Sequence, residues 1–503
     1  MRRKARTRRL ALLAVVGALA LAQAAQAQTP EVLDPELAVR VAASGLSQPT
    51  GMAFIGENDI LVNQKANGQV RRVTNGVLQP DPVLDLAVNF QSERGLLGMA
   101  LDKRFRVNGW VYLYWTQSST GVDTNVNDEV PLLGNRVDRF VWNGSTLTFD
   151  RNVIMLRAAQ PAVPATPGPA QNAAGNHDGG VLRVSPDDGK LYIFIGDVGR
   201  RGWTNNLRCG PATFYDCPPS SPLTDDIFGG PMPDDAHLTG VVLRLNPDGT
   251  APRWNPFFRY GAEVGGEVGE NIQKIYAYGF RNGYGMAFDP VGHRLWEAAN
   301  GDDTFSELEL VEAGMNSGWI QIMGPVSRVA QFKTIETTMG PTTDPFAPNG
   351  YFGLQQNRWL PTNIADTPAE ALSRLQLFPG AHYSDPELSW VYEVGPAAIG
   401  FLDGKGLGNE YKNDLFMGGS RNFLEGGHLF RFDLTGNRKG IDVSDPRLED
   451  LVADNLHKWN IVESESLLFG RNFGIVTEIL TGPNGNLFLL SNQAGAIYEI
   501  YRP

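Results

Sequence analysis

Short apolar runs that end at turns recur along the whole chain. Three of them share the order glycine, methionine, alanine and a large apolar residue, and they lie at 51–54, 98–101 and 285–288. A turn and a second apolar run follow each of them, at 60–62, 110–114 and 294–296. These runs are rich in β-branched or aromatic side chains and are bounded by Gly, Pro, Asn or Asp, which is typical of β-strands. The pattern therefore predicts repeated strand–turn–strand units.

A second motif is repeated in the middle of the chain. Residues 181–187 and 242–248 both run Val-Leu-Arg, an apolar residue, a polar residue and Pro-Asp. A further copy of strand, turn and strand lies at 477–480, 487–490 and 496–501. Helical periodicity is scarce, and 366–377 is one of the few helix candidates. Repeated strand units in a chain with 57 glycines predict an all-β fold, a β-propeller of about six blades.

Three irregular stretches interrupt the strand pattern, near 117–175, 200–236 and 325–380. Excursions of this length are usually functional rims of a fold or disordered segments, so we expect long loop insertions there. By length alone the chain could hold three domains, but all-β folds often run long as one unit. We therefore expect a single six-bladed propeller over residues 35–503.

The first 27 residues differ from the rest. A basic start is followed by an apolar run at 10–22 and by small residues at Ala25 and Ala27. This is the layout of a secretory signal peptide (1–27) with cleavage after Ala27, and the run is too short for a membrane span. Arg8 and Arg9 allow twin-arginine export, with the general secretory route as the alternative. We expect a periplasmic or secreted protein with no membrane span after cleavage.

The charge and the cysteines extend this expectation. Residues 1–27 hold six of the 43 Lys and Arg and none of the 55 Asp and Glu, so the mature balance is 37 against 55, a formal −18. Such a chain repels nucleic acid and anionic lipid surfaces, and we expect neither as a partner. Cys209 and Cys217 are the only cysteines. In an oxidising compartment they predict a disulfide, with a metal site as the alternative.

One of only six histidines, His177, stands in the polar stretch Asn-His-Asp-Gly-Gly. Two strand-like runs, 181–184 and 191–195, follow it directly. A titratable side chain on a loop held by a rigid sheet is a frequent place for proton chemistry. His177 is therefore a candidate catalytic residue, and a plain turn residue is the alternative.

Other polar residues stand in comparable positions. Arg281 and Asn282 begin a predicted strand, and Arg421 directly follows another. For both arginines a solvated surface position is the alternative. Gly301 and Asp302 belong to a loop that clusters acidic residues and backbone carbonyls, which suits a hard cation such as calcium. A solvated acidic turn is the alternative there.

Five motifs occur in the order seen in one family. They are Glu-Arg-Gly-Leu-Leu-Gly-Met-Ala from residue 93, His-Asp-Gly-Gly from 177, Tyr-Gly-Phe-Arg-Asn from 278, Ser-Glu-Leu-Glu from 306 with Ser-Gly-Trp from 317, and Asp-Leu-Phe-Met from 414. Together they resemble the soluble quinoprotein glucose/sorbosone dehydrogenases, the pyrroloquinoline quinone (PQQ)-dependent aldose sugar dehydrogenases. The resemblance runs from about Leu46 to the C-terminus, interrupted by the three insertions.

The resemblance implies a six-bladed propeller that holds PQQ and calcium over its central channel. Such enzymes oxidise the anomeric hydroxyl of an aldose to a lactone and pass the electrons to an acceptor, which the sequence does not identify. His177 would then be the general base that takes the hydroxyl proton while hydride moves to the quinone. Arg281 would stabilise the charge that the quinone gains.

The resemblance also assigns binding residues. Glu93, Asn282 and Arg421 would contact PQQ, and Arg421 stands where the family commonly has a lysine. Gly301 and Asp302 match the pair whose backbone carbonyls hold the calcium ion associated with the cofactor.

Some positions depart from the family pattern. Glu93 stands where the best-known members have a glutamine that contacts PQQ. Ile475 and Thr477 stand where those members have two arginines that bind the cofactor carboxylates, and each lost charge-assisted bond is worth roughly 1.5–3 kcal/mol. The candidates to compensate from nearby loops are Arg471, Arg200 and Arg201.

Two alternatives to a PQQ-dependent dehydrogenase remain. One is a propeller of the same family that lacks PQQ and binds a carbohydrate or a protein. The other is a calcium-dependent, lactonase-like hydrolase, because fold alone does not decide function. Tyr383 and Trp390 are candidates for the substrate entrance, with packing between blades as the alternative for Trp390.

Overall fold

The computed structural model describes residues 29–159, 175–198, 238–301, 303–319, 321–337 and 364–503. Several predictions concern other residues. The predicted signal peptide (1–27), the insertion at 200–236 with Cys209 and Cys217, and Asp302 all lie outside the described part of the chain. They stay predictions.

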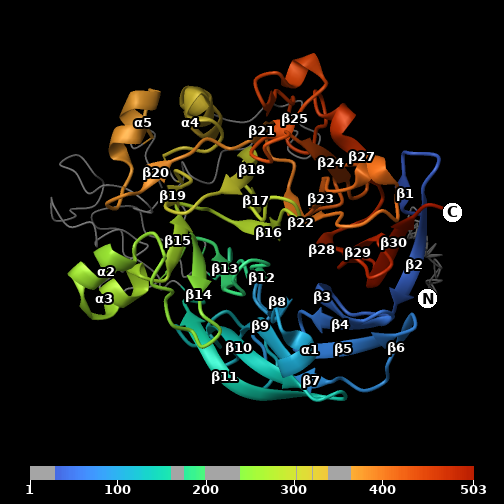
Figure 1. Cartoon of the computed structure of the whole chain (residues 1–503). Helices are drawn as coiled ribbons and strands as arrows, with labels where there is room; N and C mark the ends of the chain where they lie inside the picture. Colours follow the sequence, from blue (N-terminus) through green and yellow to red (C-terminus); the bar gives the residue numbers. More distant parts are fainter. Residues whose placement is uncertain (1–28, 160–174, 199–237, 302, 320, 338–363) are drawn as a thin grey trace, which may run out of the picture.

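The described strands form six sheets arranged around a central axis (Figure 1). The first strand of each sheet contacts the first strand of the next sheet, and the last of them contacts the first again, so these strands close a ring. The ring consists of β3 (Pro49–Gly56), β8 (Leu96–Leu101), β12 (Leu182–Val184), β16 (Gly283–Phe288), β22 (Pro396–Phe401) and β28 (Val476–Thr481). The predicted all-β, propeller-like arrangement is confirmed.

The other strands extend each sheet outward from the ring. The first sheet adds β4 (Asp59–Gln64), β5 (Gln69–Thr74), β6 (Val77–Leu78) and β7 (Leu84–Asp85), and the second adds β9 (Trp110–Thr116), β10 (Asn135–Trp142) and β11 (Leu147–Leu156). The third adds β13 (Leu191–Ile195), β14 (Val241–Leu245), β15 (Ile275–Tyr278), β19 (Met315–Asn316) and β20 (His382–Tyr383). The fourth adds β17 (Leu295–Ala299), β18 (Thr304–Val311), β21 (Leu388–Tyr392) and β26 (Val452–Ala453). The fifth adds β23 (Leu415–Gly419), β24 (Leu429–Leu434), β25 (Ile441–Asp442), β27 (Leu468–Arg471) and β1 (Glu31–Val32).

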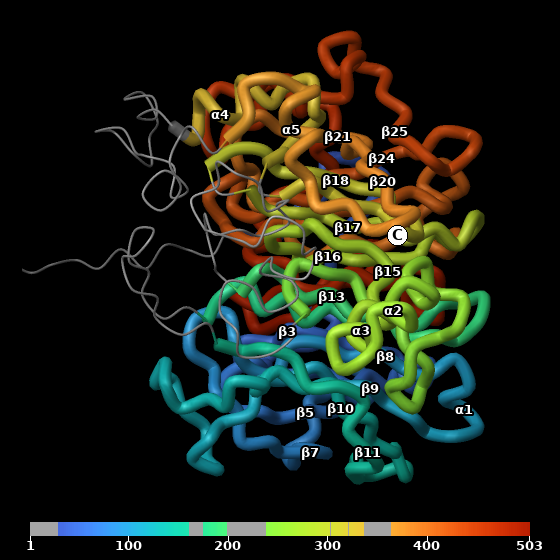
Figure 2. The backbone as a smooth tube through the Cα atoms, turned by 90° about the vertical axis from the view of Figure 1, so that its left-hand side faces the viewer, coloured from blue at the N-terminus to red at the C-terminus, as the bar shows by residue number. Residues whose placement is uncertain are grey.

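The sixth sheet joins both ends of the described chain. It consists of β28, β29 (Leu487–Ser491), β30 (Ala496–Tyr501) and β2 (Ala38–Ser44), and β2 pairs antiparallel with β30. An N-terminal strand thus completes a C-terminal sheet, which ties the ring shut. Seen from the side, the strands of the first two sheets lie at one end of the molecule and those of the fourth and fifth at the other (Figure 2).

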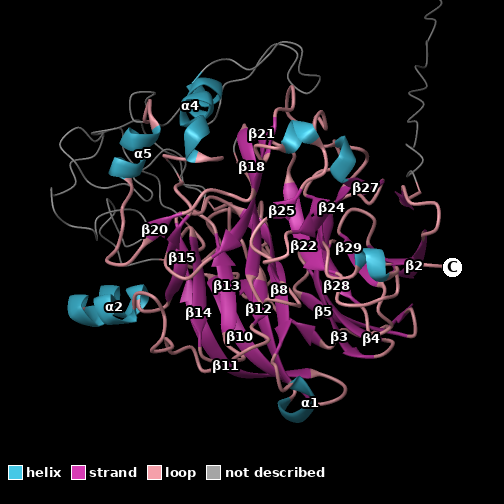
Figure 3. Ribbon diagram, turned by 45° about the horizontal axis from the view of Figure 1, so that its top comes forward, coloured by secondary structure: helices cyan, strands magenta, loops and turns pink. Residues whose placement is uncertain are grey.

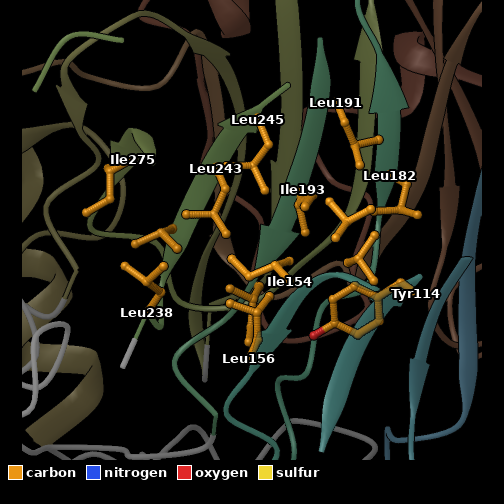
Figure 4. Packing of buried hydrophobic residues seen from close by; sticks show 14 of the residues in the cluster. Tyr114, Ile154, Leu156, Leu182, Leu191, Ile193, Leu238, Leu243, Leu245 and Ile275 are labelled. Carbon is orange, nitrogen blue, oxygen red and sulfur yellow. The ribbon is translucent and has the colours of Figure 1, made fainter. Parts of the chain in front are cut away.

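Apolar side chains fill the space between neighbouring sheets. Between the second and third sheets, Tyr114 and Ile154 pack against Leu182, Ile193 and Leu243 in one buried cluster (Figure 4). Each buried apolar side chain of this size contributes about 1.5–3 kcal/mol by leaving water. This packing fixes the sheets relative to one another, and with them the ends of the ring strands.

The stretch at 117–175 is not a simple insertion, and this part of the prediction is wrong. It contains β10 and β11, two regular strands of the second sheet. Their apolar alternation is interrupted by charged residues that pair with each other, such as Arg136 with Asp138 and Arg139 with Asp150. Outer strands of a propeller face water on part of their surface, so their sequence carries a weaker strand pattern.

Helices lie at the periphery of the strands (Figure 3). The α-helices are α1 (Phe105–Asn108), α2 (Phe258–Val264), α3 (Gly266–Ile272), α4 (Val329–Thr337) and α5 (Pro368–Arg374), and the 3-10 helices are η1 (Val326–Arg328), η3 (Asn409–Tyr411), η4 (Pro446–Leu448) and η5 (Glu465–Leu467). The helix expected within 366–377 is confirmed as α5. The Thr367 side chain caps it by accepting from the Glu370 amide, and Leu375 ends it in an extended conformation. None of the helices in the described residues is long and apolar enough to cross a membrane.

Trp390 is a packing residue. It is fully buried on β21, and its ring stacks on Phe430 with the centroids 5.6 Å apart. Of the two readings of Trp390, packing between sheets is therefore the correct one.

Candidate active site

A cavity of about 530 Å³ lies on the axis of the ring. All six ring strands line it, through Thr50, Gly98, Leu182, Tyr284, Ala397 and Thr477. Six of the predicted site residues line it as well, namely Glu93, His177, Arg281, Asn282, Gly301 and Arg421. Ring closure thus brings together residues that lie more than 300 positions apart in the sequence.

His177 stands on the loop that leads into β12. Its φ of 61° and those of Gly179 (63°) and Gly180 (99°) are all in the left-handed region, so the loop turns sharply there. The loop also packs tightly on β8, because a Cβ at Gly98 would come within 1.9 Å of the Gly180 carbonyl oxygen. The glycines therefore place a buried histidine, 2% exposed, at the cavity.

Asp197 binds the His177 ring. The Nδ1 atom of His177 lies 2.5 Å from Oδ1 of Asp197, which is fully buried at the end of β13. The second carboxylate oxygen accepts a hydrogen bond from Nε1 of Trp319 at 3.0 Å. A carboxylate accepts only, so Nδ1 carries the proton and Nε2 is the ring nitrogen left to act as a base. The sequence interpretation did not assign Asp197 a role, although Gly-Asp directly after an apolar strand is a usable signal.

Arg281 is buried beside this pair. The alternative prediction, a solvated position on the surface, is therefore wrong. Its Nη1 atom donates to the carbonyl oxygens of Asn300 and Gly301 at 2.8 and 2.6 Å. Its guanidinium lies 5.5 Å from the centre of the Trp319 ring, and its own carbonyl accepts from the Asp197 amide. His177, Asp197, Trp319 and Arg281 therefore form one connected group.

Glu93 contacts the same group through the backbone of His177. Its Oε2 atom accepts from the His177 backbone amide at 2.6 Å and lies 3.5 Å from Nδ2 of Asn282. The Tyr284 hydroxyl also bonds to this carboxylate. Burial, and then the Glu93 charge, hold the pKa of Tyr284 well above its usual range, so this hydroxyl keeps its proton.

The predicted calcium pair is only half described. Gly301 lines the cavity, and Asp302 lies outside the described residues. The Gly301 carbonyl accepts from the Arg281 guanidinium, so a calcium ion bound to this carbonyl would lie close to a second positive charge. The described residues also contain no group of three or more His, Cys, Asp or Glu side chains that could hold a metal ion.

The cavity has a different set of cations from the one expected. Ile475 and Thr477 do line it, whereas Arg471 is exposed and pairs with Glu31, and Arg200 and Arg201 lie outside the described residues. The basic side chains that line the cavity are Lys65, Arg183, Arg281, Arg421 and Lys458, and the acidic ones are Glu93, Glu393 and Glu478.

These cations are held to different degrees. Arg183 pairs with Glu478 at 2.6 Å, and Lys458 pairs with Asp303. Lys65 donates to two backbone carbonyls. Arg421 is exposed, and its guanidinium donates to the Ser420 carbonyl. Local sequence pattern could not identify Lys65, Arg183 or Lys458, because each reaches the cavity from a different sheet or loop.

The lining fits an aromatic polycarboxylate such as PQQ. Among the described residues, five cations and three carboxylates line the cavity. The Arg183–Glu478 pair cancels one of each and Asp303 offsets Lys458, which leaves three cations against two carboxylates. Asn282 offers a buried acceptor, Oδ1, that has no hydrogen-bond partner among the described residues. The volume is also within the range of about 300–1,000 Å³ that is usual for cofactor sites.

Comparison with known proteins adds to this geometry. The family model described as glucose/sorbosone dehydrogenase matches residues 46–211 and 223–345, more than half of the chain. Quinoprotein glucose dehydrogenase B of Acinetobacter calcoaceticus is 28% identical over 291 residues, which are 57% of this chain and 52% of that protein. The chain therefore matches about half the length of this relative.

Two solved structures share the fold. The apo-form of the soluble aldose sugar dehydrogenase of Escherichia coli is 18% identical, with a TM-score of 0.59 over 93% of this chain and 100% of that one. The PQQ-bound form of the aldose sugar dehydrogenase of Streptomyces coelicolor is 20% identical, with a TM-score of 0.53 over 94% and 99%. These two structures show the fold, and the family match over more than half of the chain establishes that the chain belongs to the glucose/sorbosone dehydrogenase family.

Proposed function

We propose that this chain is an exported, PQQ-dependent oxidoreductase that converts an aldose-type sugar to its lactone. The observation that carries the proposal is the His177–Asp197 pair at a cavity that Arg281 also lines. We further propose that the six sheets are the six blades of one propeller, with the predicted export signal before it.

In this mechanism, His177 accepts the proton of the sugar hydroxyl. With Nδ1 bonded to Asp197 at 2.5 Å, Nε2 is positioned to accept the proton of a sugar hydroxyl. The buried Asp197 carboxylate then stabilises the imidazolium that forms, and Trp319 keeps that carboxylate in place. PQQ, when bound, would supply a two-electron acceptor for the hydride of the carbon that carries this hydroxyl.

Other cavity residues would hold the cofactor and the developing charge. Arg281 is buried and rigidly bonded, which suits stabilisation of negative charge in a site shielded from water. Asn282 would contribute its partnerless Oδ1 acceptor, and Lys65 and Arg421 their charges. Trp459 also lines the cavity and packs edge-on against the half-exposed Phe423, 5.4 Å between centroids, and this aromatic pair suits the apolar face of a sugar.

A family member that binds a carbohydrate or protein without PQQ is the second candidate. Ile475 and Thr477 favour it, because they leave two cavity positions without charge. A titration of the purified protein with PQQ, followed by absorbance and by intrinsic fluorescence, separates the two. Absence of binding at micromolar PQQ, with and without added calcium, would remove the dehydrogenase from consideration.

If PQQ binds, reduction of an artificial dye with a panel of aldoses tests the reaction. We expect His177→Ala to lower turnover by at least about 10³-fold, since it removes the base. The PQQ dissociation constant of this variant should stay within about threefold of the original. The imidazole is bonded to Asp197, so its loss does not release any of the cations that would bind the cofactor carboxylates. Normal turnover of His177→Ala would disprove the general-base role.

A further inference from the structure

We propose that Glu93 is a positioning residue for His177, and that it performs this task at a cost in affinity for an anionic cofactor. The carboxylate binds the backbone of the base, while Asp197 binds its ring. The part of the inference that concerns turnover rests on the function proposed above, whereas the anchoring of the loop does not.

The loop that carries Glu93 is fixed from one side by Lys65. The Lys65 Nζ atom donates to the carbonyl oxygens of Phe90 and Ser92 at 3.1 and 2.8 Å. Ser92 itself has a φ of 54°, so the chain turns sharply directly before Glu93. Lys65 thus closes this turn and holds Glu93 toward the cavity.

The neighbouring residue fixes the loop from the other side. Arg94 is fully buried, and it donates to the carbonyls of Ala158, at 3.0 and 2.7 Å, and Asn127, at 2.8 Å. Gly175, two residues before His177, packs directly on this guanidinium, because a Cβ there would lie 1.7 Å from Nη2. The loop of Glu93 and the loop of His177 are therefore in contact at both Glu93 and Arg94.

The contact with His177 has a specific purpose. A residue other than glycine rarely adopts a φ of 61°, so the backbone at His177 needs an external partner to keep it. The 2.6 Å bond from its amide to a carboxylate is charge-assisted and strong. Since Asp197 also holds the ring, His177 is restrained both at its backbone and at its side chain.

The same carboxylate is badly suited to binding a polycarboxylate directly. Oε2 already faces the His177 amide and the Asn282 amide nitrogen, and the Tyr284 hydroxyl bonds to the same group. Its negative charge lines a cavity in which the proposed cofactor would place carboxylates of its own. Glu93 therefore holds the backbone of His177 in place, and its charge lowers the affinity for an anionic cofactor.

Three variants test this division of roles. Glu93→Gln keeps an oxygen that can accept from the His177 amide and removes the charge. We expect its kcat to stay within about threefold and its PQQ dissociation constant to fall about fivefold. Glu93→Ala removes the anchor, so kcat should fall at least about tenfold while KM for the sugar changes little and PQQ again binds more tightly. Glu57→Ala, on the exposed turn between β3 and β4, is the matched control.

Hydrogen exchange followed by mass spectrometry gives a readout that needs no cofactor. In Glu93→Ala, the peptide that contains His177 should exchange at least about tenfold faster, whereas Glu93→Gln and Glu57→Ala should exchange as the original protein does. A Glu93→Ala protein with unchanged kcat and unchanged exchange would overturn the inference, and so would weaker PQQ binding in Glu93→Gln. If the original protein fails to bind PQQ, the proposed function fails, and the exchange experiment still decides whether Glu93 anchors His177.

Discussion

Two different residues hold the ring and the backbone of His177. Asp197 determines which ring nitrogen carries the proton, and Glu93 holds the backbone. Trp319 links Asp197 to Arg281, so these side chains share one buried network with His177. In such a network, the loss of one member changes the geometry of the others.

Asp197→Asn tests the choice of ring nitrogen. An amide can offer an N–H to Nδ1, which would move the ring proton to Nε2 and leave no base at the cavity. We expect turnover to fall by about 10²-fold or more, with PQQ binding almost unchanged. Steady-state kinetics and a PQQ titration measure the two effects, and the ¹⁵N signals of the His177 ring report the proton's position. An active variant with its ring proton still on Nδ1 would contradict the assignment.

Asp178, next to His177, gives a prediction about stability and pH. Burial raises the pKa of its carboxyl to about 7, against the attraction of Arg94 and a bond from Asn135. The folded-state pKa lies above the unfolded value of 3.8. The contribution of this carboxyl to the free energy of unfolding is therefore fully present below about pH 4 and is lost as the pH rises toward 7. Asp178→Asn removes the charge and should stabilise the protein at pH 8, by up to about 4 kcal/mol.

Chemical unfolding of both proteins between pH 4 and pH 8 is the measurement. The advantage of Asp178→Asn should grow with pH and vanish near pH 4. An equal difference at every pH would show that the carboxyl does not titrate differently in the folded state.

At the scale of elements, the loop before β12 depends on its close fit to β8. Gly98 lies so near the Gly180 carbonyl that no side chain fits between them; Gly98 belongs to the second sheet and Gly180 to the loop that leads into the third. The glycine-methionine-alanine motif of β8 is therefore more than a strand opening. Its glycine allows the His177 loop to pack closely against β8.

Gly98→Ala should consequently displace the His177 loop. We expect a loss of about 1–3 kcal/mol in the free energy of unfolding and a fall in turnover, because overpacking moves the backbone. Gly436→Ala is the matched control, since a Cβ there meets nothing within 4 Å. Urea unfolding and dye reduction measure the two effects. A Gly98→Ala protein that equals the control in both would show that the loop tolerates the added methyl group.

At the scale of the whole molecule, ring closure creates the site. Arg183 on β12 and Glu478 on β28 belong to opposite positions in the ring, 295 residues apart in sequence, and their 2.6 Å ion pair crosses the channel. Burial raises the pKa of Glu478, and Arg183 opposes that shift. The pair thus joins two opposite sheets at the lining of the cavity.

Removing one partner of this pair should cost more than removing both. Glu478→Ala leaves the largely buried Arg183 without its counter-charge, and we expect a loss of about 3 kcal/mol in stability. The double variant Arg183→Met with Glu478→Leu should recover most of it. Denaturant unfolding of the double variant and of the single variants Arg183→Met and Glu478→Leu completes the cycle, and additive losses would mean that the pair does not couple the sheets.

The amino-acid sequence by itself determined the strand–turn units, the propeller-like arrangement, helix α5 and the loop position of His177. These features depend on side-chain periodicity and on turn residues, which report local backbone geometry and burial. The resemblance to the family also indicated six residues that line one cavity. The outer strands β10 and β11 were missed, because their charged residues pair with each other and hide the alternation.

Only the tertiary structure decided which charges meet on the axis of the ring. Asp197 beside His177, and Lys65, Arg183 and Lys458 in a cavity where Ile475 and Thr477 carry no charge, come from separate sheets and loops. Their convergence follows from the closure of six sheets into a ring, and no local pattern records that closure. The sequence therefore predicted the family and the place of His177 at the cavity, and the fold determined what holds this histidine and which cations surround it.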